Sequence, residues 1–499
     1  MDLDHDACYR AVRQRDARFD GRFFVAVKTT GIYCRPICSA RTPKSENITF
    51  YPTAAAAQEA GFRPCLRCRP ETAPDMGAWR GTSNTVTRAL GLIELGALDE
   101  ADVDALAGRL GLGERQLRRL FRQHLGASPV AVAQTRRVHL AKQLIHETRL
   151  PMAEVAFASG FGSIRRFNEA FLALFGRAPG ELRRESKPDV PVGPHGEIDV
   201  LLRYHPPYDW PAMLQFLAAR AIPGVEVVTA GRYARTVELD GVVGTVAIEP
   251  ATGERHANAL RATVRFPTLS ALPAIIARLR RVFDLAADPL AIAEHLAHDP
   301  MLAALVKARP GLRVPGAWDG FELAIRAVLG QQITVSAARR LAGKLVAARG
   351  KAIARPEDGL TRVFPRPASM AKVDLGSLGM PRSRAATLSA VAAAAIADPH
   401  LFDATADLDD AVRRLRSIRG VGEWTAQYIA LRQLREPDAF PAADVGLLRA
   451  ILDHDGREHS SAELLDRAEA WRPWRAYAAQ HLWASSLAEP ARRCMMRVA

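Results

Sequence analysis

The chain has 499 residues, of which 48% are hydrophobic and 24% are charged, and its formal net charge is +14. At about 100–200 residues per domain, this length predicts about three or four domains. The composition is that of a globular protein and argues against a disordered, collagen-like or membrane-spanning one. Residues 1–10 lack the apolar stretch of a secretory signal, so we expect a cytoplasmic protein with no membrane partner. The positive charge favours a polyanionic partner.

Cysteines are concentrated near the start of the chain, where five of the six lie in residues 1–68. Four of them form two pairs. Cys34 and Cys38 are separated by three residues, and Cys65 and Cys68 are separated by two. This spacing is typical of a zinc site with four thiolate ligands. A segment of about 75 residues has a marginal core, so bound zinc would contribute folding energy. From spacing alone, a closed structural zinc site is the simpler interpretation.

The next region, from Thr85 to Arg184, has apolar residues at helical spacing and is predicted to be all-helical. Leu106–Leu125 predicts a helix, a glycine-containing turn and a basic second helix, and Ala153–Gly176 repeats the pattern. One such pattern is weak evidence for DNA binding, because a simple packed helix pair produces it too. The side chains expected to reach base edges or phosphates are Arg115, Arg118, Arg119, Arg165, Arg166 and Asn168.

The second half of the chain follows a stretch rich in proline and glycine, residues 186–198, which predicts an extended linker. After Pro310, amphipathic helices are expected to continue to the C-terminus. Between these two regions the sequence predicts short strands of a small α+β domain at Val225–Val228, Tyr233–Leu239, Val242–Ile248 and Ala262–Phe266.

Within the helical part, Leu415–Gln427 predicts two helices joined by a Gly-Val-Gly turn. Gly420 and Gly422 would let backbone N–H groups approach a DNA phosphate, although an ordinary helix connection has the same pattern. Asp444 precedes a helix that begins near Val445, and aspartate is well suited to cap such a helix.

Two family resemblances extend the predictions for the first half. The segments TTGIYCRPICSAR and GFRPCLRC resemble the N-terminal domain of the Ada methyl-DNA response regulators over most of residues 1–75. Residues 84–185 resemble the AraC-type DNA-binding domain. The Ada resemblance implies that Cys34 accepts a methyl group from a DNA methylphosphotriester while the other three cysteines remain zinc ligands. Loss of one negative charge on methylation would weaken repulsion by DNA and could switch DNA binding. Candidates for docking the phosphate are Arg35, Arg41 and Lys44.

A third resemblance covers residues 199–499, which contain FELAIRAVLGQQ, GVGEWTAQY and RPWRAYAAQHLW. These segments are similar to the AlkA-type 3-methyladenine DNA glycosylases of the helix-hairpin-helix superfamily. The resemblance implies base flipping into a pocket that contains Trp424, Tyr428 and Trp483, although core packing could explain each ring. It also implies that Asp444 stabilises the oxocarbenium charge and orients or activates water.

Differences from related families narrow the expected chemistry. Trp424 stands where bifunctional relatives carry a Schiff-base lysine, so no β-lyase step is expected. Only Cys494 is available in this half, so no iron–sulfur cluster is expected. In the AlkA-type family an apolar side chain fills the gap left by the flipped base, and Gln332 stands at that position here. Ala443 stands where AlkA-type proteins can have a second aspartate next to the catalytic one. A monovalent cation at the hairpin is a further expectation. The chain lacks a Pro-Cys-His-Arg motif, so O6-methylguanine methyltransferase activity is not predicted.

The predicted fold is therefore multidomain, with a zinc-bound α+β domain (1–75) and an all-α double helix-turn-helix domain (84–185). The linker (186–198) leads to an AlkA-type α+β domain (199–310) and an all-α helix-hairpin-helix glycosylase domain (311–499). The predicted protein senses and repairs alkylated double-stranded DNA in the cytoplasm, associated with the nucleoid, using one Zn²⁺, with RNA polymerase as a further partner. One alternative is a zinc-dependent transcription regulator whose C-terminal half only binds damaged DNA. A second alternative is a repair enzyme whose N-terminal half merely anchors it to DNA.

Overall fold

The computed structural model describes residues 3–74, 84–184, 197–253, 257–371, 375–403 and 407–496. Most of the predicted linker, residues 186–198, lies outside these described residues. Contacts divide the chain into two compact units. The first comprises Met1–Tyr204 with Pro250–Ala277, and the second comprises His205–Glu249 with Arg278–Ala499. Strands of the predicted 199–310 domain therefore occur in both units.

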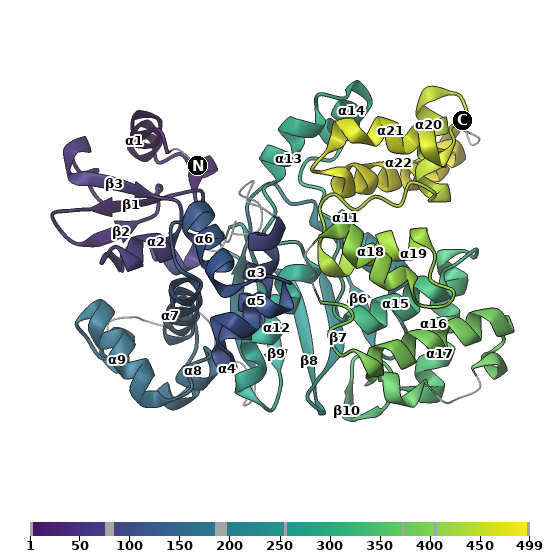
Figure 1. The fold of residues 1–499 in the computed structure, drawn as a ribbon, viewed down its shortest axis with the longest axis horizontal. Coiled ribbons are helices and arrows are strands. Elements are labelled where there is room, and N and C mark those ends of the chain that lie inside the picture. The colour runs from purple at the N-terminus through teal and green to yellow at the C-terminus, as the bar shows by residue number, and fades with distance from the viewer. Residues whose placement is uncertain are drawn as a thin grey trace. The chain divides into compact units, whose positions relative to one another are not determined.

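The N-terminal part of the first unit contains a four-stranded sheet in the order β3-β1-β2-β4. Figure 1 labels its strands β1, β2 and β3. All four residues of β1 (Phe24–Val27) are buried because alternate side chains pack on opposite faces. Val25 and Val27 pack with α1 (His5–Gln14), whereas Phe24 and Ala26 pack with α2 (Ala54–Glu59). The remaining strands are β2 (Ile32–Cys34), β3 (Ile48–Tyr51) and β4 (Arg63–Pro64).

Two helix-turn-helix motifs follow in the same unit, and the predicted all-helical character is confirmed. Helix α5 (Val103–Arg109) precedes α6 (Glu114–Leu125), and α8 (Met152–Ala158) precedes α9 (Ile164–Phe175). In each second helix, three residues spaced four apart are buried: Leu117, Phe121 and Leu125, and Phe167, Phe171 and Phe175. The other helices are α3 (Asn84–Glu94), α4 (Ala97–Glu100), the connecting α7 (Pro129–Glu147) and α10 (Pro179–Arg184).

Two strands from the AlkA-like part of the sequence complete the first unit. β5 (Ile198–Arg203) pairs antiparallel with β9 (Ala259–Arg265), with Val200 opposite Ala262 and Leu202 opposite Leu260. β9 begins three residues before the predicted strand.

The second unit contains an antiparallel meander of β6 (Glu226–Thr229), β7 (Arg232–Leu239) and β8 (Val242–Pro250), which confirms three predicted strands. It differs from the all-helical expectation for 311–499 in one hairpin, β10 (Ala352–Glu357) with β11 (Leu360–Arg362). Asp358 and Gly359 both have positive φ, and an Asp-Gly pair favours the tight turn that this hairpin needs.

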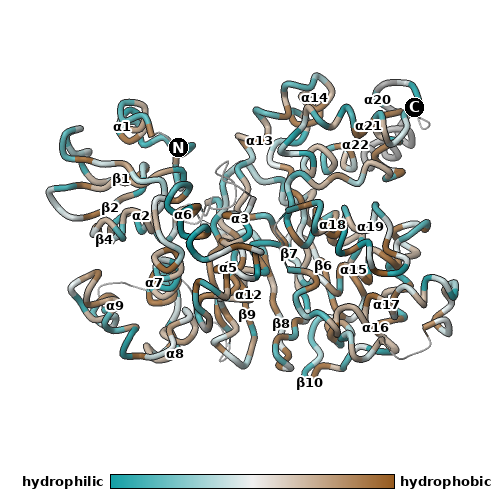
Figure 2. The backbone as a smooth tube through the Cα atoms, in the orientation of Figure 1, coloured by the Kyte–Doolittle hydropathy of each residue, from teal (hydrophilic) through white to brown (hydrophobic). Residues whose placement is uncertain are grey.

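Most other elements of the second unit are helices, and α12 runs from the first unit into the second. Figure 2 shows hydrophilic positions interspersed with hydrophobic ones along them. Among the described residues, no helix is long and apolar enough to cross a membrane. The helices are α11 (Trp210–Arg220), α12 (Leu272–Val282), α13 (Pro289–Leu296), α14 (Pro300–Ala308), α15 (Gly320–Leu329), α16 (Val335–Arg349), α17 (Arg382–Ala397), α18 (Leu408–Arg416), α19 (Glu423–Ile429), α20 (Val445–Asp455), α21 (Ser461–Ala468) and α22 (Arg475–Met496).

Candidate functional site

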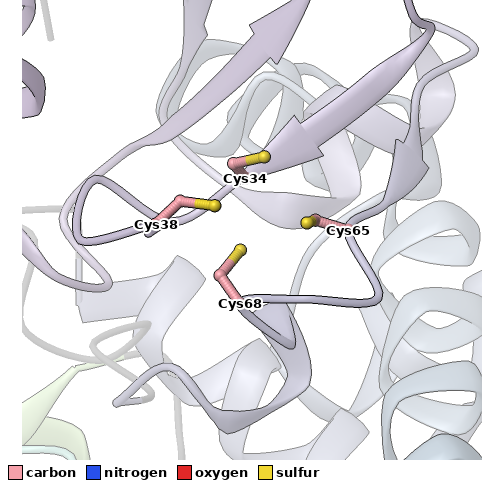
Figure 3. Close-up of side chains that lie close together, drawn as sticks. All are labelled: Cys34, Cys38, Cys65 and Cys68. Carbon is pink, nitrogen blue, oxygen red and sulfur yellow. The ribbon is translucent and has the colours of Figure 1, made fainter. Parts of the chain in front are cut away.

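The four predicted cysteine ligands meet at one end of the N-terminal sheet. Strand β2 pairs in parallel with β4, so Cys34 at the end of β2 and Cys65 just after β4 emerge at the same edge. Short turns bring Cys38 and Cys68 to face them, and the four sulfurs point toward a shared centre (Figure 3). All four sulfur atoms lie within 4.8 Å of one another. Tetrahedral Zn²⁺ with Zn–S bonds of about 2.3 Å separates its sulfurs by about 3.8 Å, so the cluster fits this metal.

Cys65 is buried, whereas the other three cysteines are partly exposed. The N–H of Arg35 donates to Cys68 Sγ at 3.3 Å. The Arg35 guanidinium forms an ion pair with Asp20 and donates to Thr72 Oγ1 at 2.8 Å. A DNA phosphate contact by Arg35 would thus require its guanidinium to leave these partners.

The other predicted DNA-binding side chains of the first unit are accessible. Arg41 and Lys44 near the cysteine cluster are exposed. On α6 and α9, one arginine each forms an exposed ion pair with a glutamate one helical turn away. These pairs are Arg118 with Glu114 and Arg165 with Glu169. Such pairs are weak and can yield to phosphates. The exposed residues on these two helices include Arg115, Arg118, Arg119, Arg165, Arg166 and Asn168.

In the second unit, Asp444 is the N-cap of α20, as predicted. Its Oδ1 accepts hydrogen bonds from the N–H groups of Gly446 at 2.8 Å and Leu447 at 3.1 Å. The same oxygen accepts from Trp483 Nε1 at 2.9 Å, and Oδ2 accepts from Trp424 Nε1 at 2.7 Å. Four donors therefore fix the orientation of the carboxylate. Capping and a site role are compatible, because Oδ2 has one protein donor and remaining capacity to accept.

The three predicted aromatic residues converge beside this carboxylate from α19 and α22. Trp424 stacks on Tyr428 with ring centroids 5.2 Å apart and an interplanar angle of 12°. Trp483 meets Tyr428 edge to face at 6.3 Å. All three rings are only partly buried, unlike core aromatics such as Trp471, which is 1% exposed. Half-buried aromatic faces can stack on a planar ligand.

The hairpin between α18 and α19 lies next to a second candidate segment. Gly420 has a φ of +85°, and the exposed Gln332 has a φ of +57°. Gln331 Nε2 donates to the carbonyl oxygen of Gly420 at 3.2 Å and to Thr425 Oγ1 at 3.0 Å. The sequence predictions missed Gln331, although it lies in the GQQ segment that carries the AlkA resemblance.

A second missed residue is Arg432, one turn beyond Tyr428. It is buried and donates to the Tyr428 hydroxyl at 2.8 Å. The sequence contained a signal for this contact, because residues four apart on a helix are neighbours and Arg432 is four residues after Tyr428.

These features define a multidomain protein that joins a thiolate metal centre, tandem helix-turn-helix motifs and a helix-hairpin-helix base-excision fold. Family models match in this order: the metal binding domain of Ada at residues 7–71, a helix-turn-helix domain at 106–185, the AlkA N-terminal domain at 199–319 and the HhH-GPD superfamily base excision DNA repair protein at 325–476. The predicted family resemblances are confirmed.

The chain belongs to the family of bifunctional transcriptional activator/DNA repair enzymes named AlkA. It is 42% identical over 485 residues to the probable bifunctional transcriptional activator/DNA repair enzyme AlkA of Mycobacterium tuberculosis H37Rv, covering 97% of both chains. It is also 34% identical to DNA-3-methyladenine glycosylase 2 of Escherichia coli K12 over 56% of this chain and 95% of that protein. A 3-methyladenine DNA-glycosylase from Archaeoglobus fulgidus shares the fold over 58% of this chain and 98% of its own, with a TM-score of 0.51 and 22% identity.

Proposed function

We propose that this chain repairs alkylated DNA by two reactions and regulates transcription in response to one of them. Cys34 takes a methyl group irreversibly from a DNA methylphosphotriester, and Asp444 supports hydrolytic excision of N-alkylated bases of the 3-methyladenine class. The observation that carries the excision proposal is the Asp444 carboxylate, held by two indole N–H groups beside half-buried rings. The Mycobacterium tuberculosis relative, named as a probable bifunctional transcriptional activator/DNA repair enzyme, supports the combination of functions.

Base excision begins with extrusion of the damaged base, which costs a few kcal/mol and less for a poorly paired base. Trp424, Tyr428 and Trp483 offer π-faces that suit an electron-poor or cationic alkylated purine. The N-glycosidic bond then breaks, and its electron pair leaves with the base. Asp444 stabilises the positive charge that develops on the sugar and orients the attacking water, whose oxygen bonds to C1′ and whose proton is released.

The same residues support a monofunctional glycosylase. A β-lyase step needs an amine nucleophile at the hairpin, and this chain has Trp424 at the corresponding position, with its N–H used by Asp444. The product is therefore free base and an intact abasic strand. The exposed Gln332 is proposed to fill the gap left by the flipped base.

Methyl transfer takes place at the cysteine cluster. Bound Zn²⁺ would keep the four sulfurs deprotonated and nucleophilic at neutral pH. The Cys34 sulfur forms an S–CH₃ bond as the phosphotriester O–CH₃ bond breaks, and the phosphate regains its negative charge. Arg41 and Lys44, both exposed, would dock the DNA backbone.

We further propose double-stranded DNA as the partner of both halves, which the helix-turn-helix and HhH-GPD matches support. RNA polymerase as a second partner, a nucleoid-associated cytoplasmic location, a monovalent cation at the hairpin and the lack of an iron–sulfur cluster are parts of the same proposal.

The excision proposal is tested by measuring 3-methyladenine and 7-methylguanine released from methylated duplex DNA. Asp444→Asn is expected to slow release by at least ~100-fold while the asparagine still caps α20. Asp299→Asn is a matched control, because Asp299 caps α14 and accepts from Trp471 Nε1 at 2.9 Å. Unchanged release by Asp444→Asn would refute the catalytic role. No release by the wild type would leave a protein whose second half only binds damaged DNA.

The methyl-transfer proposal is tested by incubating the zinc-loaded chain with DNA that contains methylphosphotriesters and mapping the modified peptide by mass spectrometry. A single added methyl group on Cys34 is expected. A methyl group on Cys38, Cys65 or Cys68 would refute the choice of acceptor, and no modified peptide would refute the reaction.

A further inference from the structure

Helix α7 connects the two helix-turn-helix motifs and carries an unusual set of buried polar residues. Lys142, Gln143 and Glu147 occupy its last two turns and are at most 7% exposed. Buried polar groups are stable only when they are hydrogen-bonded or paired, so their partners identify what this part of the helix contacts.

Two of these residues bind a single strand residue outside the helix-turn-helix region. Gln143 Nε2 donates to the carbonyl oxygen of Leu201 at 2.8 Å, and Glu147 Oε2 accepts from the Leu201 N–H at 3.2 Å. Gln143 Nε2 also donates to Glu147 Oε2 at 2.8 Å, which holds the two side chains together. Both backbone polar groups of Leu201 are thereby satisfied by α7.

Leu201 lies in β5, the edge strand that pairs with β9. In an antiparallel pair, alternate residues direct their N–H and C=O groups to opposite sides, so Leu201 faces away from β9. An uncovered edge of this kind readily pairs with other chains. Here the Gln143 carboxamide donor and the Glu147 carboxylate acceptor replace the N–H donor and C=O acceptor of a neighbouring strand.

The same end of α7 also binds the segment that contains two of the cysteines. Lys142 Nζ donates to the carbonyl oxygen of Cys65 at 3.3 Å and pairs with Glu71 at 2.8 Å, with both charged side chains fully buried. Arg69, which follows Cys68, lies 3.6 Å from Glu147. Burial raises the pKa of Glu147, and the Gln143 hydrogen bond and the Arg69 charge oppose this rise.

We propose that α7 is a docking element that binds the β5 edge of the AlkA-like region to the DNA-binding region, with Gln143 and Glu147 as its anchors. The proposal goes beyond the repair and regulatory activities, and it does not depend on the assignment of Cys34 or Asp444. It means that the two regions are joined by a specific surface as well as by the predicted linker.

The first test uses the full chain with a protease site placed in residues 186–198. After cleavage of the folded, zinc-loaded protein, the two pieces are expected to co-elute in size-exclusion chromatography. In Gln143→Met/Glu147→Met they are expected to separate, because Leu201 loses both partners. The matched control Gln116→Met/Glu181→Met changes two exposed residues and is expected to co-elute. Separation of the wild-type pieces, or co-elution of the anchor variant, would overturn the proposal.

Hydrogen exchange of the uncut chain provides a second measurement, and its first comparison uses the wild type alone. The Leu201 amide is expected to be protected in the wild type, and exchange at its intrinsic rate would overturn the proposal. In the anchor variant, exchange is expected to accelerate by about 10- to 100-fold at Leu201, while Val200 and Leu202, paired with β9, remain protected. Glu147→Gln keeps an acceptor oxygen and is expected to retain most of the protection. Equal Leu201 protection in the wild type and the anchor variant would contradict the anchoring role.

Discussion

Asp444 and Asp299 have nearly the same local chemistry. Each caps a helix with Oδ1 and accepts an indole N–H through Oδ2. Their surroundings differ: the tryptophan that binds Asp299 is buried, whereas Asp444 accepts from two half-buried tryptophans. Asp444 therefore differs from an ordinary helix cap in the accessible rings around it and not in the capping motif.

The hydrogen bond between Trp424 Nε1 and Asp444 predicts that one substitution slows base release. Trp424→Phe keeps an aromatic ring but removes the N–H that donates to Oδ2. A hydrogen bond to a charged group contributes about 1.5–3 kcal/mol, so we expect single-turnover base release to slow by about 10- to 100-fold. Tyr428→Phe is the control, because that hydroxyl accepts from Arg432 and not from a group bound to Asp444. Equal slowing by both variants would indicate ring packing instead.

The two glycines of the α18–α19 hairpin differ in what surrounds them. A Cβ on Gly420 would lie 2.0 Å from Thr387 Oγ1, and its φ of +85° is itself unfavourable for other residues. A Cβ on Gly422 would meet nothing within 4 Å. Gly420 is thus required by packing inside the protein, while Gly422 leaves open space where a DNA phosphate could approach.

This difference predicts opposite behaviour for two alanine variants. Gly420→Ala is expected to lower the free energy of unfolding by about 2 kcal/mol or more, from strain and the Thr387 contact. Gly422 is the N-cap of α19, and Gly422→Ala is expected to lower the free energy of unfolding by about 1 kcal/mol or less. The same variant is expected to weaken DNA binding at constant salt. Urea denaturation and fluorescence anisotropy with duplex DNA measure the two effects. Unaltered affinity in Gly422→Ala would argue against a phosphate contact at this turn.

Buried ion pairs join parts of the second unit that are far apart in sequence. Glu322 on α15 pairs with Arg235 on β7 at 2.7 Å and with Arg326 at 2.6 Å. Arg326 also pairs with Glu226 on β6. Such a network stabilises only while all its members are present, because one missing partner leaves an unpaired buried charge.

The network predicts a loss of stability in acid. Burial opposes ionisation of Glu322, but Arg235 and Arg326 lower its pKa from 4.5 to about 2. A carboxylate with a lowered folded-state pKa stabilises the fold above pH 4.5, here by on the order of 3 kcal/mol, and this contribution disappears as the pH falls toward 2. The difference in melting temperature between wild type and Glu322→Gln is therefore expected to shrink over this range. The exposed Glu294→Gln should show no such trend, and a constant difference for Glu322→Gln would contradict the assignment.

Local patterns in the sequence were enough to predict which residues form the cysteine cluster, the two helix-turn-helix motifs and the cap at Asp444. Each of these rests on short-range information: ligand spacing, the 3.6-residue period of a helix, or the preference for aspartate at a helix start. The Asp358-Gly359 turn carried an equally local signal that the sequence predictions did not use.

The partners of many of these side chains are visible only in the folded chain. The fold directed the Arg35 guanidinium to Asp20, brought the Trp483 N–H to Asp444 across 39 residues, and set Gln143 and Glu147 against Leu201. Side chains such as arginine, tryptophan and glutamine can donate to many acceptors with similar free energy. The acceptor that each one contacts depends on which distant segments of the chain come together in the fold. A local sequence pattern does not contain that information.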